Sequence, residues 1–338
     1  MKRSRKVVFL LVFLLVIGIA FVYSGGTGEG DTAKTYTIRA HYTNSPGEPQ
    51  VQGAELFKQI VEEKTDGKVK VEIYPNNQLG ESMEVLASVQ NATIQMANVT
   101  GPMVNFVPEV KIFELPFMFR DKEHLNAVLD DPEVTNPIRE AMEAKGFHLL
   151  GLEDVGLRHI MTTKATGPIK SINDLEGLKI RLMENPIHLE AYRAFGAAPL
   201  PMAYGELYTA LEQDVIDGAE AANINYYSKS FYEPAPYWAQ VGWINLIGYT
   251  VMSKTFYDSL PAEYQKIIDD ASKESTRLER KLYAEWEVER LEDLKAKGVE
   301  VSYPDVEPFR KAAQKVYEKY ADEVGGMELI DAIRNYKY

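Results

Sequence analysis

The sequence predicts an α/β protein of two domains, and three observations lead to this prediction. The chain has 338 residues, which is enough for two domains of ordinary size. Short strands alternate with helices of roughly ten to fifteen residues, which is typical of helix-covered parallel sheets, and the pattern starts again after Phe147. Near the C-terminus, one helix would run for roughly 55 Å at 1.5 Å per residue, long enough to pass between two domains.

The first α/β unit follows from the spacing of apolar residues, which is two in strands and three to four in helices. Val69, Val71 and Ile73, for example, alternate with charged residues and predict a strand. The predicted strands of this unit are 36–42, 68–74 and 94–99. Its predicted helices are 50–64 and a helix that begins at Ser82.

The second unit shows the same alternation. Its predicted strands are 148–152, 179–183 and 215–219, and its predicted helices run from Pro186 to a stop at Gly196 and over 206–213. Proline is favoured at the first position of a helix, which supports the start at Pro186. Ligands of open parallel sheets bind at the carboxyl ends of the strands, so residues near these ends are candidates for a binding site.

The long helix is predicted from Pro261 to about Lys297. Residues three and four positions apart predict one common face of this helix, which carries Tyr264, Ile268, Ala271, Ser275, Leu278, Leu282 and Trp286. Charges of both signs occupy the remaining positions, as expected for a face in water. We expect domain I to comprise 36–158 and about 247–286, and domain II to comprise 159–246 and about 287–338.

The N-terminus has the pattern of an export signal. Lys2, Arg3, Arg5 and Lys6 precede an apolar run over 7–23, which predicts a secretory signal peptide over 1–24 with cleavage before Gly25. The alternative is an uncleaved membrane anchor, because the run is about long enough to span a bilayer. Residues 25–35 are rich in glycine and threonine and predict a flexible leader. Both interpretations place the remaining chain in the periplasm or elsewhere outside the cytoplasm.

Composition and charge exclude several classes of protein. The sequence has no cysteine, which excludes disulfides, thiolate metal sites and a lipidated cysteine. Of the 37 basic residues four lie in the signal, so the rest of the chain carries 33 − 50 = −17 charges. Such a surface repels phosphates, and we expect no nucleic-acid partner. A small anion would need a local, inward-facing group of positive charges.

The sequence lacks the motifs of the common enzyme classes. The five histidines are scattered without a metal-binding spacing, and neither a Gly-x-Ser-x-Gly elbow nor a P-loop is present. We therefore expect no metal and no cofactor. Asp217 and Glu220 could form a carboxylate pair for acid–base catalysis, so a secreted hydrolase stays open as an alternative. The simpler interpretation is two acids near a strand end of an acidic protein.

Two arginines are the strongest candidates for binding a small anion. Arg181 in "GLKIRLMENP" and Arg158 in "VGLRHIMTT" each lie between apolar neighbours on a predicted strand. A guanidinium forms two parallel hydrogen bonds with a carboxylate, which lysine cannot reproduce, so two arginines in one cleft would select an organic acid. The alternative is that each pairs with a structural carboxylate or reaches solvent. Nearby aromatic residues, including Tyr204 and Trp243, could stack on a ligand or belong to the core.

Several motifs resemble those of a known family. The stretch "GLKIRLMENPIHLEAYRAFGAAPLPMAYGELYTALEQDVIDGAEA" resembles the signature of the solute-binding proteins of TRAP transporters, the DctP-like family. Further similarity lies in "ELFKQIVEEKTDGKVKVEIYPNNQLGE", in "FELPFMFRDKEH" and in the long helix after Pro261. The resemblance covers the chain from Tyr36 to the C-terminus. It implies a periplasmic-binding-protein-like fold, with two α/β domains joined by hinge strands and a domain-spanning helix.

The resemblance also implies roles for individual residues. The arginine of the "LKIR" strand, here Arg181, forms the salt bridge to the substrate carboxylate in this family. A second ligand-contacting arginine falls on Arg158. Other expected ligand contacts are Tyr204, Ser82, Glu184, Asn98 and Thr100, and His41 and Trp243 complete the candidate set. Where many relatives have asparagine, this chain has Ala221, and Asn223 is the nearest replacement.

The function implied is a monomeric extracytoplasmic receptor that binds an organic acid and hands it to a TRAP membrane permease, which is driven by a sodium gradient. The polar set of Glu184, Ser82 and Asn223 favours a hydroxylated acid, such as a uronate or an aldonate, over a plain dicarboxylate. A binding protein of an ATP-driven transporter is an alternative, and the long helix after Pro261 argues against it. A tethered sensory or adhesive module is a third possibility.

Overall fold

Two β-sheets organise residues 34–337, which are the residues that the computed structural model describes. The predicted signal and most of the predicted leader lie outside this range. Within 34–337, no helix combines the length and the apolar character needed to cross a membrane.

The first sheet has the strand order β2-β1-β3-β10-β4. Its strands are β1 (Tyr36–Tyr42), β2 (Val69–Tyr74), β3 (Met96–Val99), β4 (Phe147–Leu157) and β10 (Asn245–Ser253). Strands β1, β2 and β3 are parallel, whereas β10 runs antiparallel to both of its neighbours. The helices associated with this half are α1 (Pro49–Lys64), α2 (Ser82–Gln90), α3 (Lys122–Asp130), α4 (Pro132–Ala144) and α8 (Lys254–Asp258).

The second sheet has the order β11-β9-β5-β8-β6-β7. Its strands are β5 (His159–Thr162), β6 (Lys179–Leu182), β7 (Ala198–Pro201), β8 (Gly218–Ala221), β9 (Tyr237–Ala239) and β11 (Glu300–Ser302). The helices between them are α5 (Pro186–Ala194), α6 (Leu207–Glu212) and α7 (Asn223–Ser228). Strand β5 is antiparallel to both neighbours, and β8 begins three residues later than predicted. The prediction of parallel sheets was wrong for β5 and β10, because strand direction depends on long-range pairing that local periodicity does not encode.

Two long strands connect the sheets. Strands β4 and β10 form an antiparallel ladder from Phe147–Ser253 to Leu157–Asn245. Beyond this ladder, β4 leads through Arg158 directly into β5 of the second sheet, and β10 returns from the second sheet after β9. These are the hinge strands expected from the resemblance. The exact domain boundaries expected from the sequence stay a prediction.

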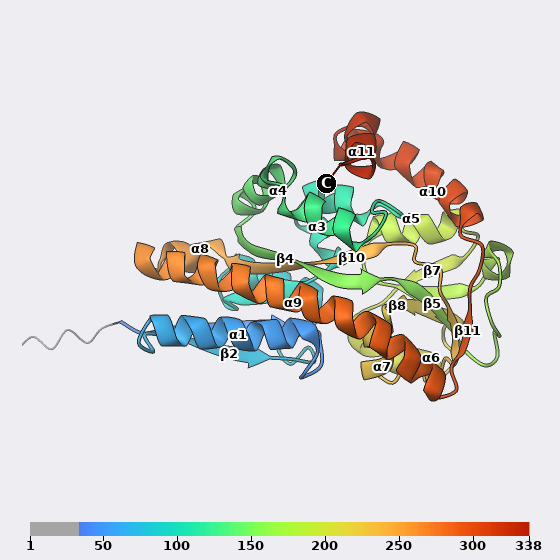
Figure 1. Cartoon of the computed structure of the whole chain (residues 1–338), viewed down its shortest axis with the longest axis horizontal. Coiled ribbons are helices and arrows are strands. Elements are labelled where there is room, and N and C mark those ends of the chain that lie inside the picture. The colour runs from blue at the N-terminus through green and yellow to red at the C-terminus, as the bar shows by residue number, and fades with distance from the viewer. Residues whose placement is uncertain (1–33, 338) are drawn as a thin grey trace, which may run out of the picture. The chain divides into compact units, whose positions relative to one another are not determined.

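Helix α9 (Ala262–Ala296, 35 residues) packs on α1, β4 and α7, as Figure 1 shows. Its buried face differs from the predicted one, because Leu278, Leu282 and Trp286 are only half-buried. The buried positions include the polar residues Ser272, Ser275, Glu279, Tyr283 and Glu287. Several of them bond backbone groups of the neighbouring elements: Ser275 Oγ donates to the carbonyl of Gly53, and Tyr283 Oη donates to that of Val155.

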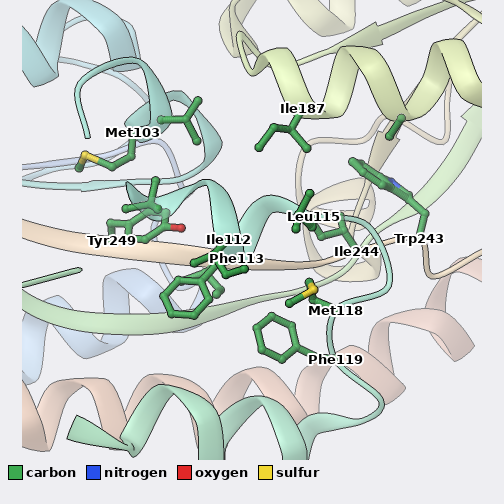
Figure 2. Packing of buried hydrophobic residues seen from close by; sticks show 14 of the residues in the cluster. Met103, Ile112, Phe113, Leu115, Met118, Phe119, Ile187, Trp243, Ile244 and Tyr249 are labelled. Atoms are coloured by element: carbon green, nitrogen blue, oxygen red, sulfur yellow. The ribbon is translucent and has the colours of Figure 1, made fainter. Parts of the chain in front are cut away.

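The main hydrophobic core draws residues from both halves of the chain. Figure 2 shows Leu115, Met118 and Phe119 beside Ile187 of α5 and Trp243, which precedes β10. The C-terminal helices α10 (Glu307–Tyr320) and α11 (Met327–Arg334) add Phe309 and Ile330 to the same core. Burial of such side chains stabilises the fold by roughly 25 cal/mol per Å² of apolar surface.

Candidate functional site

The carboxyl ends of strands from both sheets converge on one cavity. Thr43 and Asn44 follow β1, Thr100 follows β3, Tyr204 follows β7, and Arg181 lies within β6. Ser82, at the start of α2, Arg158, Glu184 and Asn225 complete much of the polar lining. This is the position at which open α/β sheets bind their ligands. Six of the ten residues selected from the sequence therefore lie together: Arg181, Arg158, Tyr204, Glu184, Ser82 and Thr100.

Arg181 is buried without a carboxylate partner. Its Nε and Nη2 donate to the carbonyl of Met202 at 3.0 and 2.7 Å, and the residue is 2 % exposed. Within 34–337 no acidic side chain lies in ion-pair distance of its guanidinium. Burial lowers its pKa, the nearby charge of Glu220 opposes that shift, and the charge of Arg158 adds to it. A buried positive charge bonded only to a carbonyl costs free energy that an anion in the cavity would offset.

Arg158 has a different environment, although its sequence context is similar. Its Nε and Nη2 bond the carboxylate of Glu220 at 2.6 and 3.2 Å, and Nη2 also bonds the carbonyl of Glu220 at 3.2 Å. Glu220 is fully buried on β8, and burial tends to raise its pKa. The charge of Arg158 and its hydrogen bonds outweigh this and lower the pKa. Arg158 also lines the cavity, and its Nη1 donates to Asn225 Oδ1 at 3.4 Å. The pair is therefore close to neutral.

Tyr204 supplies an aromatic ring and a hydroxyl to the cavity. The guanidinium carbon of Arg181 lies 5.7 Å from the ring centroid, within the range of a cation–π interaction. The hydroxyl is buried and has no hydrogen-bond partner among the described residues. Burial raises its pKa, so the group stays protonated and can donate to an anion or a hydroxyl.

The rest of the lining is acidic or neutral. Glu184 and Glu81 contribute carboxylates, and Ser82 contributes a hydroxyl. Glu81 already accepts two hydrogen bonds from Asn77 Nδ2, at 3.0 and 2.9 Å. Thr100 Oγ1 lies 3.8 Å from the sulfur of Met183. The carboxylates of Glu184 and Glu81 and the hydroxyl of Ser82 can accept hydrogen bonds from the hydroxyl groups of a ligand.

Asn225 and Asn44 line the cavity and were not selected from the sequence. Asn223 was predicted from the sequence instead, but its side chain is buried against α9 and β9. It bonds Glu287 and accepts from the indole nitrogen of Trp238 at 2.8 Å. Residues two apart on a helix point in different directions, so only one of the two asparagines of α7 can face the cavity. The sequence shows that two asparagines lie close together, but it does not show which of their side chains faces the cavity.

Three more selected residues lie away from the cavity lining. Asn98 donates to Glu153 and Thr250 at 2.9 and 2.8 Å inside the first sheet. His41 is fully buried on β1, where burial lowers its pKa to about 4 and keeps it neutral. Trp243 packs its ring on His188 and Tyr192 in the core. Internal hydrogen bonds explain the position of Asn98. His41 and Trp243 are held by packing alone, because the ring nitrogens of His41 and the indole nitrogen of Trp243 are buried without a hydrogen-bond partner among the described residues.

A family model identifies the chain. The model for the bacterial extracellular solute-binding proteins of family 7, named DctP, matches residues 40–323. The chain belongs to this family of TRAP solute receptors. A solute-binding protein of Verminephrobacter eiseniae is 35 % identical over 266 residues, which cover 78 % of each chain.

Solved structures of TRAP receptors share the fold. A receptor from Polaromonas sp. JS666 bound to D-erythronate is 33 % identical with a TM-score of 0.86, covering 90 % of this chain and 99 % of that one. A receptor from Sulfitobacter sp. NAS-14.1 with bound β-D-galacturonate is 30 % identical with a TM-score of 0.82, covering 88 % and 98 %. Members of the DctP family are periplasmic, bind small organic acids and work with TRAP membrane components.

Membership of the DctP family decides between the alternatives, because its members are receptors and not enzymes. Asp217 and Glu220, the carboxylates considered for a hydrolase, each have a structural partner in the fold. Glu220 is bound to Arg158, and Asp217 Oδ2 accepts from the backbone nitrogen of Lys179 at 2.7 Å. Neither carboxylate lines the cavity. Within 34–337, no group of three or more histidine, aspartate or glutamate side chains could hold a metal ion.

Proposed function

We propose that this chain is an extracytoplasmic receptor that binds a sugar acid, such as a uronate or an aldonate, and delivers it to a TRAP membrane permease. The observation that carries the proposal is the buried guanidinium of Arg181, which faces the cavity without a carboxylate partner. A ligand carboxylate in the cavity would balance the positive charge of Arg181 and form a salt bridge with it. Export by the N-terminal segment and action as a monomer belong to the same proposal.

The charges of the cavity favour an acid with one carboxylate and several hydroxyls. The charge of Arg158 is compensated by its ion pair with Glu220, so Arg181 is the one cationic side chain of the described cavity lining without an ion-pair partner. A second ligand carboxylate would meet Glu184 or Glu81, and like charges repel. Hydroxyl groups can instead donate to these carboxylates and to Asn44. D-erythronate and D-galacturonate, the ligands of the two similar receptors, each have one carboxylate and several hydroxyls.

Binding would draw the two sheets together around the ligand. Before binding, water solvates the cavity, and the receptor populates open states. A carboxylate that bonds Arg181 shifts the population toward the closed state. Closure excludes water, which lowers the local dielectric and strengthens the ion pair.

A thermal-shift screen tests the proposal. D-erythronate and D-galacturonate are compared with erythritol and D-galactose, which lack the carboxylate, and with succinate, which carries two. A ligand that binds only the folded state raises the melting temperature. We expect a shift of several degrees with at least one sugar acid and none with its neutral analogue. A shift with succinate alone, or equal shifts with galactose and galacturonate, would contradict the proposal.

A further inference from the structure

A buried carboxylate outside the cavity connects a loop that follows a strand of the first sheet with a helix that follows a strand of the second. Glu48 lies between β1 of the first sheet and α1, and it is 2 % exposed. Four donors surround its two oxygens. Two come from its own loop, Asn44 Nδ2 at 2.8 Å and the backbone nitrogen of Ser45 at 3.0 Å. Two come from α7, which follows β8 of the second sheet: Asn225 Nδ2 at 3.0 Å and Ser228 Oγ at 2.7 Å.

The arrangement of these donors is symmetrical. Each oxygen of Glu48 accepts one bond from its own loop and one from α7. Within the described chain, no lysine or arginine lies in ion-pair distance of Glu48, so these donors and the start of α1 stabilise its charge. If the sheets move apart, Glu48 keeps its local partners and exchanges the two from α7 for water. Its hydrogen bonds therefore differ between a closed and an open receptor.

The contact reaches the ligand cavity through Asn225. The Nδ2 of this amide donates to Glu48, and its Oδ1 accepts from Arg158 Nη1. Because both ends of the amide are engaged, its orientation is fixed. Asn225 and Asn44 line the cavity, whereas Glu48 does not. Glu48 therefore acts on a ligand only through the residues that it holds in place.

A second contact joins the same two segments. Lys229, which directly follows α7, donates from Nζ to the carbonyl of Thr43 at 3.2 Å and to Asn76 Oδ1 at 2.7 Å. Its Nζ also lies 5.9 Å from the ring centroid of Tyr204, on the cavity wall. The loop after β1 thus meets α7 and Lys229 through three direct polar contacts, and Asn76, which follows β2, adds a fourth contact to Lys229.

We propose that Glu48 is a positioning residue that holds the receptor closed around its bound acid and so sets the rate at which the acid dissociates. The inference rests on the proposed function, since it requires a ligand in the cavity. Hydrogen bonds formed only in the closed state slow opening, and they leave the encounter of ligand with the open state largely unchanged.

The test measures association and dissociation rates of D-galacturonate and D-erythronate by stopped-flow fluorescence. Glu48→Gln preserves the shape of the side chain but leaves one oxygen to accept hydrogen bonds where the carboxylate has two. The new amide group donates hydrogen bonds and would face two of the four donors that surround Glu48. We expect dissociation to become about tenfold faster, since hydrogen bonds to charged groups are involved, with association changed less than about threefold. Glu63→Gln, the same substitution at an exposed position of α1, is the matched control and should behave as the unmodified protein.

Ser228→Ala separates positioning from a purely local structural role. This change removes one donor from α7 and leaves the loop of Glu48 intact, so we expect dissociation to become a few times faster without a change in the melting temperature of the ligand-free protein. Combined with Glu48→Gln it should add little, because both changes remove the same bond. Dissociation at the original rate in Ser228→Ala would overturn the proposal, even if Glu48→Gln weakens binding. If the unmodified protein binds no sugar acid, the proposed function fails first and this inference falls with it.

Discussion

Arg158 and Arg181 occupy similar sequence contexts but different electrostatic environments. Both are buried, both lie on or beside a strand, and both line the same cavity. Arg158 is bound by the carboxylate of Glu220, whereas Arg181 is bound only by the carbonyl of Met202. Under the proposed function, Arg158 belongs to the wall of the site and Arg181 is the arginine that remains for the ligand. The partner of each guanidinium, and not its neighbours in sequence, makes this distinction.

The largest expected effect on stability concerns the pair on the wall. Glu220→Gln would leave the charge of Arg158 buried without a counter-charge, and breaking such a pair typically costs roughly 3–5 kcal/mol. Urea unfolding followed by circular dichroism measures the loss. Arg181→Met, which removes an uncompensated charge, should cost far less. If the two variants unfold at the same urea concentration, the proposed difference between the arginines is wrong.

The sequence predicts the elements better than their assembly. Strands such as 36–42 and helices such as α1 and α9 follow from local periodicity, which depends only on nearby residues. Strand β10 was not predicted, and the antiparallel direction of β5 and β10 was not predicted either, because it depends on pairing between distant segments. At the site, Arg181, Arg158 and Tyr204 could be selected from motif and residue type. The ion pair of Arg158 with Glu220 could not, because the two residues meet only across neighbouring strands.

A smaller effect is expected from the hydroxyl of Tyr204. Because this group has no partner among the described residues, Tyr204→Phe should leave the free energy of unfolding nearly unchanged. If the hydroxyl donates to the ligand, affinity should fall by about 0.5–1.5 kcal/mol. Isothermal titration with the acid that gives the largest thermal shift measures the change. If Tyr204→Phe binds the acid with full affinity but is less stable, the hydroxyl stabilises the fold and does not contact the ligand.

The smallest effect concerns a region remote from the cavity. Burial opposes protonation of His148, but hydrogen bonds to Asp269 and Glu143 outweigh it and raise its pKa above the ordinary 6.5. A raised pKa stabilises the fold fully below the unfolded value, and this contribution is lost as pH rises through the folded pKa. Relative to His148→Gln, the protein should be more stable by up to about 1 kcal/mol at pH 5.5, with a smaller difference at pH 8.5. Urea unfolding at the two pH values measures it, and a difference that grows with pH would contradict the assignment.

The central claim, that Arg181 receives the ligand carboxylate, is tested most directly by titrating one sugar acid into the unmodified protein, Arg181→Ala and Arg181→Lys. We expect Arg181→Ala to lose roughly 2–5 kcal/mol of binding free energy, the range for truncating one partner of a buried charged pair. Arg181→Lys should also bind poorly, because an ammonium cannot replace the two parallel hydrogen bonds of the guanidinium. Near-normal binding by both variants would show that Arg181 is a structural residue and that the ligand carboxylate binds elsewhere.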